Sequence, residues 1–235
     1  MRLWSAASLT LAALVCAAAA HAQPYTFRWE ASSGNLPDLG CPFWTLTDNS
    51  AAVPSLSAGV LTLATTSAGS NNLYYADQAP DVVVPNPWIL EFRGRYVSGT
   101  SGSTARSAMM VQASTVANVL ASIAIGPDQV KILSGDFTIG ATANVDTDGA
   151  FHTYRIVING TSLGSPVQVY YDSGLILNGA LYSLAQPAAR VLWGEASTLA
   201  FGTSEWLYFE HNGSAASCVT PVAPSSWGRI KTLYR

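Results

Sequence analysis

The most regular group of reactive side chains in this chain of 235 residues lies in the segment WILEFRGRY at 88–96. Side chains of a strand alternate between two faces, so Glu91, Arg93 and Arg95 share one face and the apolar residues between them share the other. One acid and two guanidinium groups can hydrogen-bond sugar hydroxyls or the carboxylate of a uronate. A solvated sheet surface would carry the same residues, so the pattern leaves both interpretations open.

Paired carboxylates suited to acid–base or nucleophilic chemistry are not evident. The closest acidic pair on one expected strand is Glu205 and Glu210 in EWLYFEH. Because their offset of five is odd, a regular strand points them to opposite faces. Hydrolysis of a glycosidic bond needs two carboxylates that converge on that bond. We therefore predict no catalytic residue.

Histidine, serine and metal chemistry have equally weak signals. Of the two histidines beyond residue 22, His152 falls on the apolar face of FHTYRIVI, as a structural histidine would, and His211 is far from it in sequence. No nucleophile elbow is expected, although composition does not exclude a Ser/His/Asp site. Asp146 and Asp148 can supply some of the oxygens that calcium requires, but an acidic turn without metal explains them as well. We therefore expect no cofactor and assign no metal ligand, with a structural Ca²⁺ left open.

Short alternating runs, typical of strands, must position these residues. In FHTYRIVI at 151–158 alternate residues form an apolar face, and VQVYYD at 167–172 alternates again after an Asn-Gly turn signal. In YTFRWE, alternation places Tyr25, Phe27 and Trp29 on one side. About twelve such runs are separated by turn signals, and none has the period of a core helix. The pattern predicts an all-β protein built as a two-sheet antiparallel sandwich.

The strands FHTYRI and VQVYYDSG, joined by a short loop, resemble the hairpin of the concanavalin A-like lectin/glucanase superfamily, which includes laminin-G-like modules and the family 16 glycanases. Four further segments resemble strands of secreted bacterial laminin-G-like modules, so the resemblance spans nearly the whole mature chain. It implies a two-sheet antiparallel jelly roll, and it implies a carbohydrate-related function by the habit of the superfamily. The four segments are SSGNLPD at 32–38, SAGVLTL at 57–63, WILEFRGRYVSG at 88–99 and WGEASTLAFGTSEWLYFEHNG at 193–213.

The resemblance also bears on catalysis. In the glycanases the carboxylates come from the strand that VLASIAIGPD resembles here, and its centre, residues 121–124, holds only Ala, Ser and Ile. Lyase chemistry would need Arg, Gln, His and Tyr clustered on the concave sheet; the lyase motifs are absent, but basic and tyrosine residues suited to that face are present. The candidate ligand-binding residues are Glu91, Arg93, Arg95, Arg106 and Tyr170.

The beginning of the chain predicts export. Arg2 is followed by an apolar run to Ala20 and by the small-x-small pattern Ala20-His21-Ala22, which predicts a secretory signal peptide over residues 1–22. We therefore expect a secreted protein, extracellular or periplasmic. Cys16 leaves with the signal peptide, so Cys41 and Cys218 are expected to form a disulfide in an oxidising compartment, the alternative being two unrelated thiols.

Composition and charge limit the remaining organisation. Residues 23–218 suit one jelly-roll domain. Residues 219–235 are expected to form a Pro-containing connector and a short basic amphipathic tail. Three alternatives stay open for the tail: it docks on its own domain, it serves attachment or sorting, or it is frayed. Hydrophobic residues make up 49% of the chain and charged residues 11%, which excludes disorder. Without Arg2, 10 of the 11 basic residues remain against 14 acidic ones, so neither nucleic acid nor an anionic membrane is an expected partner. No second long apolar segment follows the signal peptide, so no membrane span is expected.

Three functional hypotheses follow. The first is a non-catalytic, secreted glycan-binding or adhesion module of laminin-G-like type. The second is an extracellular structural or matrix-interaction protein, and the third a divergent polysaccharide hydrolase or lyase. The expected partner is an extracellular glycan or a component of the cell envelope.

Overall fold

The computed structural model describes residues 25–40, 44–49, 52–66, 72–78, 82–100, 106–135, 138–197 and 200–213. The expected signal peptide, both cysteines of the expected disulfide, Cys41 and Cys218, and the tail 219–235 lie outside these ranges, so those expectations stay predictions. No helix among the described residues is long and apolar enough to cross a membrane.

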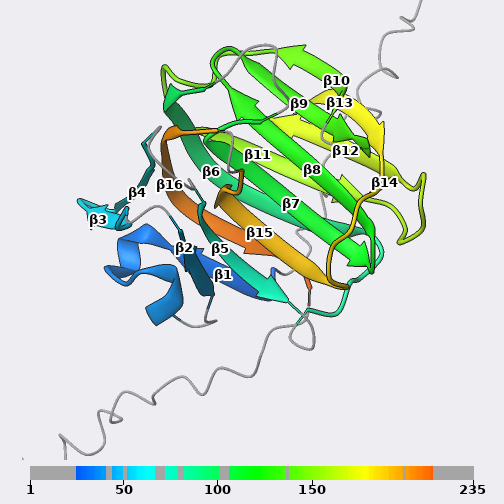
Figure 1. Ribbon diagram of the computed structural model, residues 1–235, viewed down its shortest axis with the longest axis horizontal. Helices are drawn as coiled ribbons and strands as arrows, with labels where there is room; N and C mark the ends of the chain where they lie inside the picture. Colours follow the sequence, from blue (N-terminus) through cyan, green and yellow to red (C-terminus); the bar gives the residue numbers. More distant parts are fainter. Residues whose placement is uncertain are drawn as a thin grey trace, which may run out of the picture.

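The described residues form two antiparallel sheets packed face to face (Figure 1). Sheet A has β6 and β16 at its centre, and β1 (Phe27–Glu30) also pairs with β16. Neighbours such as β6 and β16 are far apart in sequence, which is the cross-connected pattern of a jelly roll. The order of sheet A is β13 (Gly174–Ala180), β12 (Pro166–Tyr171), β11 (His152–Ile158), β6 (Trp88–Gly99), β16 (Gly202–His211), β4 (Val60–Ala64) and β3 (Ser55–Ser57).

Sheet B lies in front of sheet A in Figure 1, and β14 (Tyr182–Ser183) also pairs with its strand β8. Two short 3₁₀ turns, η1 (Ala31–Ser33) and η2 (Pro37–Leu39), are the helical elements described. The architecture confirms the predicted all-β, two-sheet antiparallel jelly roll. The order of sheet B is β10 (Thr138–Asn144), β9 (Gln129–Ser134), β8 (Val119–Gly126), β7 (Met109–Val116), β15 (Arg190–Glu195), β5 (Leu73–Gln78) and β2 (Thr45–Asp48).

Aromatic rings fill the space between the sheets. Trp193 of sheet B stacks on Phe209 of sheet A at 5.2 Å and contacts Trp206 at 5.0 Å. Such pairs contribute ~0.5–1.5 kcal/mol beyond the burial of their area. Every tryptophan that the structure describes is buried in this core, so none is free to stack on a ligand: Trp29, Trp44, Trp88, Trp193 and Trp206.

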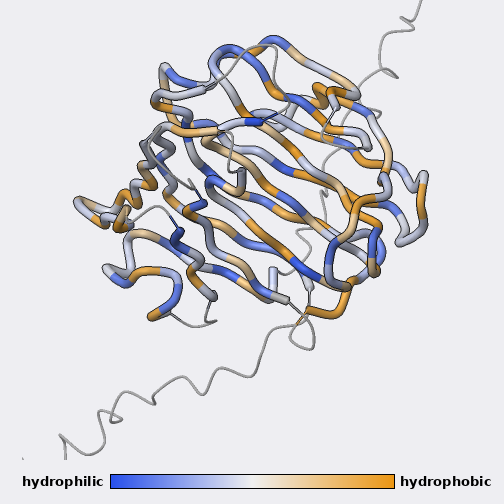
Figure 2. Tube along the Cα trace, viewed as in Figure 1, coloured by the Kyte–Doolittle hydropathy of each residue, from blue (hydrophilic) through white to orange (hydrophobic). Residues whose placement is uncertain are grey.

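Hydropathy alternates along strands that have one side in the core and the other side toward solvent (Figure 2). On β6 the residues Leu90 and Phe92 are fully buried and Arg93 is exposed. The alternation thus sends the polar residues of β6, β11 and β12 to the outer face of sheet A.

The strand β16 contains a β-bulge. Trp206 pairs with Gly94 and Tyr208 pairs with Arg93, so Leu207 is an extra residue without a partner on β6. Gly94 allows the close approach, since a Cβ there would lie 2.7 Å from the carbonyl oxygen of Glu205. The bulge reverses the alternation of β16 and so changes which residues face outward.

Candidate functional site

A row of polar residues crosses the outer face of sheet A. Arg28 on β1, Glu210 on β16, Glu91 on β6, Arg155 on β11 and Tyr170 on β12 follow one another in register. Directly opposed side chains on one face lie ~4.5–5.5 Å apart, so they form one continuous band. A neighbouring row contains Tyr208, Arg93 and Thr153.

Glu91 is the centre of the first row. Its Oε2 accepts hydrogen bonds from Arg155 Nε at 2.7 Å and from the Tyr25 hydroxyl at 2.9 Å. Its Oε1 accepts one from the Tyr208 hydroxyl at 3.0 Å. Burial, followed by the charge of Glu91 and this hydrogen bond, raises the pKa of Tyr208 to about 12, so the phenol remains a donor at neutral pH. The carboxylate is therefore held by three donors from three parts of the chain.

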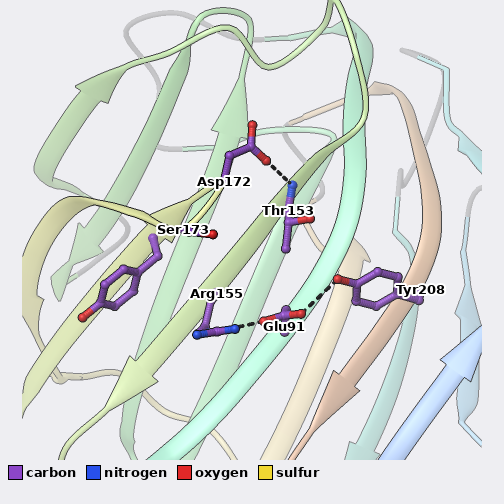
Figure 3. Close-up of a pocket in the computed structure, with 7 residues that line it drawn as sticks. Glu91, Thr153, Arg155, Asp172, Ser173 and Tyr208 are labelled. Atoms are coloured by element: carbon purple, nitrogen blue, oxygen red, sulfur yellow. Dashed lines mark hydrogen bonds and ion pairs between the residues drawn. The ribbon is translucent and has the colours of Figure 1, made fainter. Parts of the chain in front are cut away.

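A depression of about 370 Å³ opens beside Glu91, within the usual size range of small-ligand sites of ~300–1,000 Å³ (Figure 3). Figure 3 shows Arg155 and Tyr208 converging on Glu91. The lining is polar and contains two tyrosine rings. It comprises Glu91, Thr153, Arg155, Tyr170, Asp172, Ser173 and Tyr208.

One rim of the depression is the turn between β12 and β13. Asp172 and Ser173 have φ of 45° and 76°, the left-handed values of a type I′ hairpin turn. Asp172 Oδ1 accepts from the Thr153 backbone N–H at 2.9 Å, and its Oδ2 lies 2.7 Å from His152 Nδ1. Partial burial alone would raise the pKa of Asp172, but the hydrogen bonds with His152 and Thr153 outweigh it and lower the pKa. The rim thus presents a fixed, ionised carboxylate.

The structure brings together four of the five candidate ligand-binding residues. Glu91, Arg93 and Arg95 share the outer face of β6, and Tyr170 joins them from β12. Arg106 does not belong to this group, because it precedes β7 of sheet B.

Arg95 and Arg93 differ in what surrounds them. The Nε of Arg95 donates to Glu205 Oε2 at 2.7 Å, and its guanidinium lies 4.8 Å from the centre of the Phe151 ring. Arg93 is exposed, and no hydrogen bond or ion pair reaches it within the part of the chain that the structure describes. Of these two neighbouring arginines, Arg93 keeps its donors available.

Two sequence-based expectations about this face were wrong. Glu205 and Glu210 do not point to opposite faces, because the bulge at Leu207 restores both to the outer face, opposite Arg95 and Glu91 respectively. Tyr25 does not share the core side of Phe27. It lies ahead of β1, and its hydroxyl reaches Glu91 on the outer face.

Several lining residues are not predicted by the sequence pattern. Thr153 and Arg155 had a signal, since alternation places them opposite the apolar face of β11. For Tyr208, the alternation of a regular strand gives no signal, because the bulge determines which face of the sheet its side chain lies on. The sequence predicts Asp172 and Ser173 at the end of a strand, whereas they form the rim turn.

Three glutamates of this face are each engaged with an arginine. Glu91 pairs with Arg155 and Glu205 with Arg95, each at 2.7 Å, and Glu210 pairs with Arg28. Burial raises the pKa of Glu210, although the Arg28 charge opposes the shift. The arrangement is suited to fixing the positions of hydrogen-bonding groups.

The strand that the glycanase resemblance nominated is β8. Its outward residues Leu120 and Ala124 belong to a small buried cluster with Tyr182. The Tyr182 hydroxyl donates to Ser122 Oγ at 2.8 Å. The middle of β8 therefore supplies packing and carries no carboxylate.

Asp146 and Asp148 lie with Asp128 in an exposed acidic cluster whose carboxylate oxygens fall within 4.8 Å of one another. The Oδ1 of Asp146 accepts the backbone N–H of Gly149 at 2.9 Å and that of Asp148 at 3.2 Å. These hydrogen bonds, with that from Gly149 the largest, lower the pKa of Asp146. The geometry is that of an acidic turn closed on its own backbone.

No family model and no curated protein sequence matches this chain. Among solved structures, it is similar to the binding domain of botulinum neurotoxin serotype G, with a TM-score of 0.53 and 10% identity over 89% of this chain and 50% of that one. It is also similar to the Emp47p carbohydrate recognition domain, with a TM-score of 0.44 and 13% identity over 73% of this chain and 89% of that one. A third neighbour is the Bacillus licheniformis β-glucanase, with a TM-score of 0.43 and 11% identity over 72% and 91%.

By their own descriptions, these neighbours include a carbohydrate recognition domain and a glucanase. At identities this low the likeness concerns the fold alone. The feature of this chain that bears on its function is the depression on sheet A.

Proposed function

We propose that this protein is a non-catalytic glycan-binding module of laminin-G-like type, exported from the cell, which holds a sugar in the depression beside Glu91. The observation that carries the proposal is the combination of a small hollow, a mainly polar lining and side chains hydrogen-bonded to one another. Fixed groups lose little freedom when a ligand binds, which favours affinity for a small polar molecule.

The lining offers both kinds of hydrogen-bonding partner that a sugar ring requires. Asp172 is half exposed and accepts hydrogen bonds from hydroxyls, while the terminal nitrogens of Arg155 and the Ser173 hydroxyl donate to them. Tyr170 and Tyr208 add ring surface with a polar tip. A few convergent polar groups with aromatic surface are typical of small-molecule sites.

The same contacts favour binding without catalysis. A glycoside hydrolase needs one carboxyl group that gives a proton and one that attacks or activates water. Here Glu91, Glu205 and Glu210 are each ion-paired with an arginine, so all three are engaged in contacts within the protein. The expected signal peptide and the low charge of the chain support an extracellular glycan as the partner.

The test is a glycan array followed by titration calorimetry with the glycans that bind. We expect binding that falls about tenfold or more in Tyr170→Ala and in Asp172→Asn, since each change removes at least one hydrogen bond or ring contact. Glu205→Gln is the matched control, because this carboxylate lies on the same face outside the depression, and it should keep the wild-type affinity. Absence of binding to any glycan, or equal losses in the three variants, would refute the proposal.

One observation favours a second candidate, a divergent polysaccharide hydrolase. Glu91 and Glu210 are direct cross-strand neighbours on the outer face, so two carboxyl groups stand side by side. Incubation with soluble polysaccharides separates the two functions. Release of reducing ends that stops in Glu91→Gln and Glu210→Gln would replace the binding module with a hydrolase.

A further inference from the structure

The arginines on the outer face of sheet A are not equivalent. Arg95 donates to Glu205 at 2.7 Å and Arg155 to Glu91 at 2.7 Å. Arg28 pairs with Glu30 and Glu210 at the other end of the polar row. Arg93 has no such carboxylate among the described residues, although it stands between Tyr208 and Thr153, which both line the depression. An exposed guanidinium beside a binding site, with its five N–H donors unused, can bind an anion on a ligand.

Asp172 is near Arg93 but does not engage it. Burial raises the pKa of Asp172, and the charge of Arg93 is one of the weaker causes that lower it, after the hydrogen bonds with His152 and Thr153. Both oxygens of Asp172 are already directed at those two partners. The guanidinium of Arg93 therefore lies close to the rim without a hydrogen bond to it.

Arg155 offers a second set of donors. Only its Nε takes part in the contact with Glu91, and its side chain is 49% exposed. Arg93 is opposite Thr153 and Arg155 is opposite Glu91, so the two arginines are diagonal neighbours on one sheet face, at ~7–8 Å. Two guanidinium groups at this spacing can approach a single carboxylate from two sides.

We infer that the ligand is an acidic glycan whose sugar carries a carboxylate, of the uronate or sialate class, bound between Arg93 and the terminal nitrogens of Arg155. This inference rests on the proposed glycan-binding function and names the class of sugar. The carboxylates of the site do not prevent it, since Glu91 is ion-paired with Arg155, and Asp172 accepts a hydrogen bond from the Thr153 backbone and lies 2.7 Å from His152 Nδ1. A sugar that carries both an acid and hydroxyls matches a site that offers guanidinium donors and carboxylate acceptors.

The first arm of the test compares matched ligands. Each uronate- or sialate-bearing glycan is presented to the purified protein beside the same glycan with its carboxyl groups reduced to alcohols. We expect the acidic member of a pair to bind ~10- to 100-fold more tightly, the effect of a charge-assisted, bidentate contact. The preference for the acidic glycan should also shrink as the salt concentration is raised, because both arginines are in contact with solvent.

Sulfated analogues form the third set of ligands. If they bind as tightly as the carboxylate-bearing glycans, the assignment to a carboxylate is overturned.

The second arm compares two neighbouring arginines. Arg93→Ala should remove most of the preference for the acidic glycan, while Arg95→Ala, on the same strand and face but paired with Glu205, should keep it. Equal losses in the two variants would overturn the role of Arg93. Far-ultraviolet circular dichroism and thermal unfolding of both variants confirm that they are folded before they are compared.

The outcomes for ligand class and for function are distinct. If neutral glycans bind as well as acidic ones, and Tyr170→Ala removes that binding while Arg93→Ala does not, the carboxylate is wrong and the glycan-binding function stands. If no glycan binds to the wild-type protein, both fail together.

Discussion

At the scale of single residues, Glu91 connects three segments that are distant in sequence. Its side chain is only 11% exposed, yet it accepts hydrogen bonds from Tyr25 before β1, Arg155 on β11 and Tyr208 on β16. A partly buried charge of this kind is tolerated when its oxygens are saturated by donors. Glu91 is thus both a structural residue and a residue of the candidate site, whereas Glu205 forms an ion pair with one arginine, Arg95.

We predict that Glu91→Ala lowers the free energy of unfolding by about 2–3 kcal/mol, because it leaves two tyrosine hydroxyls and one guanidinium without their acceptor. Glu205→Ala, the matched change in a more exposed ion pair, should cost less than about 1 kcal/mol. Urea unfolding followed by tryptophan fluorescence measures both. Equal costs would show that the three hydrogen bonds of Glu91 contribute no more than a surface ion pair.

The site could be predicted from the sequence only in part, and the reason is local. Alternation placed Glu91, Arg93 and Arg95 on one face, and the same rule places Thr153 and Arg155 there. It failed for Tyr25, which lies outside the strand that the alternation assumed. It also could not separate Arg93 from Arg95, because the difference between them is a partner on another strand.

At the scale of elements, the turn between β12 and β13 holds a non-glycine residue in a strained conformation. Ser173 has φ of 76°, and the exposed side chain makes no hydrogen bond within the described residues. A residue with a Cβ has a steric cost in the left-handed region of φ that glycine does not have. The turn is thus set by the register of the hairpin rather than by the preference of Ser173.

We predict that Ser173→Gly raises the free energy of unfolding by about 0.5–1 kcal/mol, since an Asp-Gly pair suits a type I′ turn. Gly164→Ala is the reverse control, because it removes a glycine from a position of positive φ. Gly164 has φ of 83°, and no atom lies within 4 Å of the position that a Cβ would take there, so that change should lower stability by a similar amount through the backbone alone. Thermal and urea unfolding report both, and a loss of stability in Ser173→Gly would contradict the strain.

The fold itself could be predicted from alternation and turn signals, but the bulge in β16 could not be derived from a regular strand. One signal was present. Trp206 and Phe209 are both fully buried although they are three residues apart, an odd spacing that a strand without a bulge cannot place on one face. The error over Glu205 and Glu210 came from applying a period of two across that point.

At the scale of the whole molecule, two buried ionisable groups link stability to pH. His211 is fully buried and stacks on Phe27 at 4.7 Å, and burial lowers its pKa to about 3. Glu195 is 1% exposed at the end of β15. Burial raises the pKa of Glu195 to about 8, despite the hydrogen bond from the Ser197 backbone. Each group is therefore neutral in the folded protein over a pH range in which the unfolded chain carries its charge.

These two shifts predict a stability maximum between about pH 4.5 and 6.5. The unfolded chain loses the Glu195 proton above the ordinary pKa of 4.5 and the folded protein loses it only near 8, so this group makes stability fall as pH rises through that range. The unfolded chain protonates His211 below 6.5 and the folded protein only near 3, so this group makes stability fall as pH drops. The two slopes of the free energy of unfolding, each ~1.4 kcal/mol per pH unit, oppose each other where the two pH ranges overlap, and each acts alone outside the overlap.

Urea unfolding across pH 3 to 9 should show the plateau. Glu195→Gln should abolish the fall in stability above pH 6.5, whereas the matched change Glu205→Gln at the surface should keep that fall. An alkaline fall that persists unchanged in Glu195→Gln would mean that another group, and not this buried carboxyl, limits the stability of the sandwich at high pH.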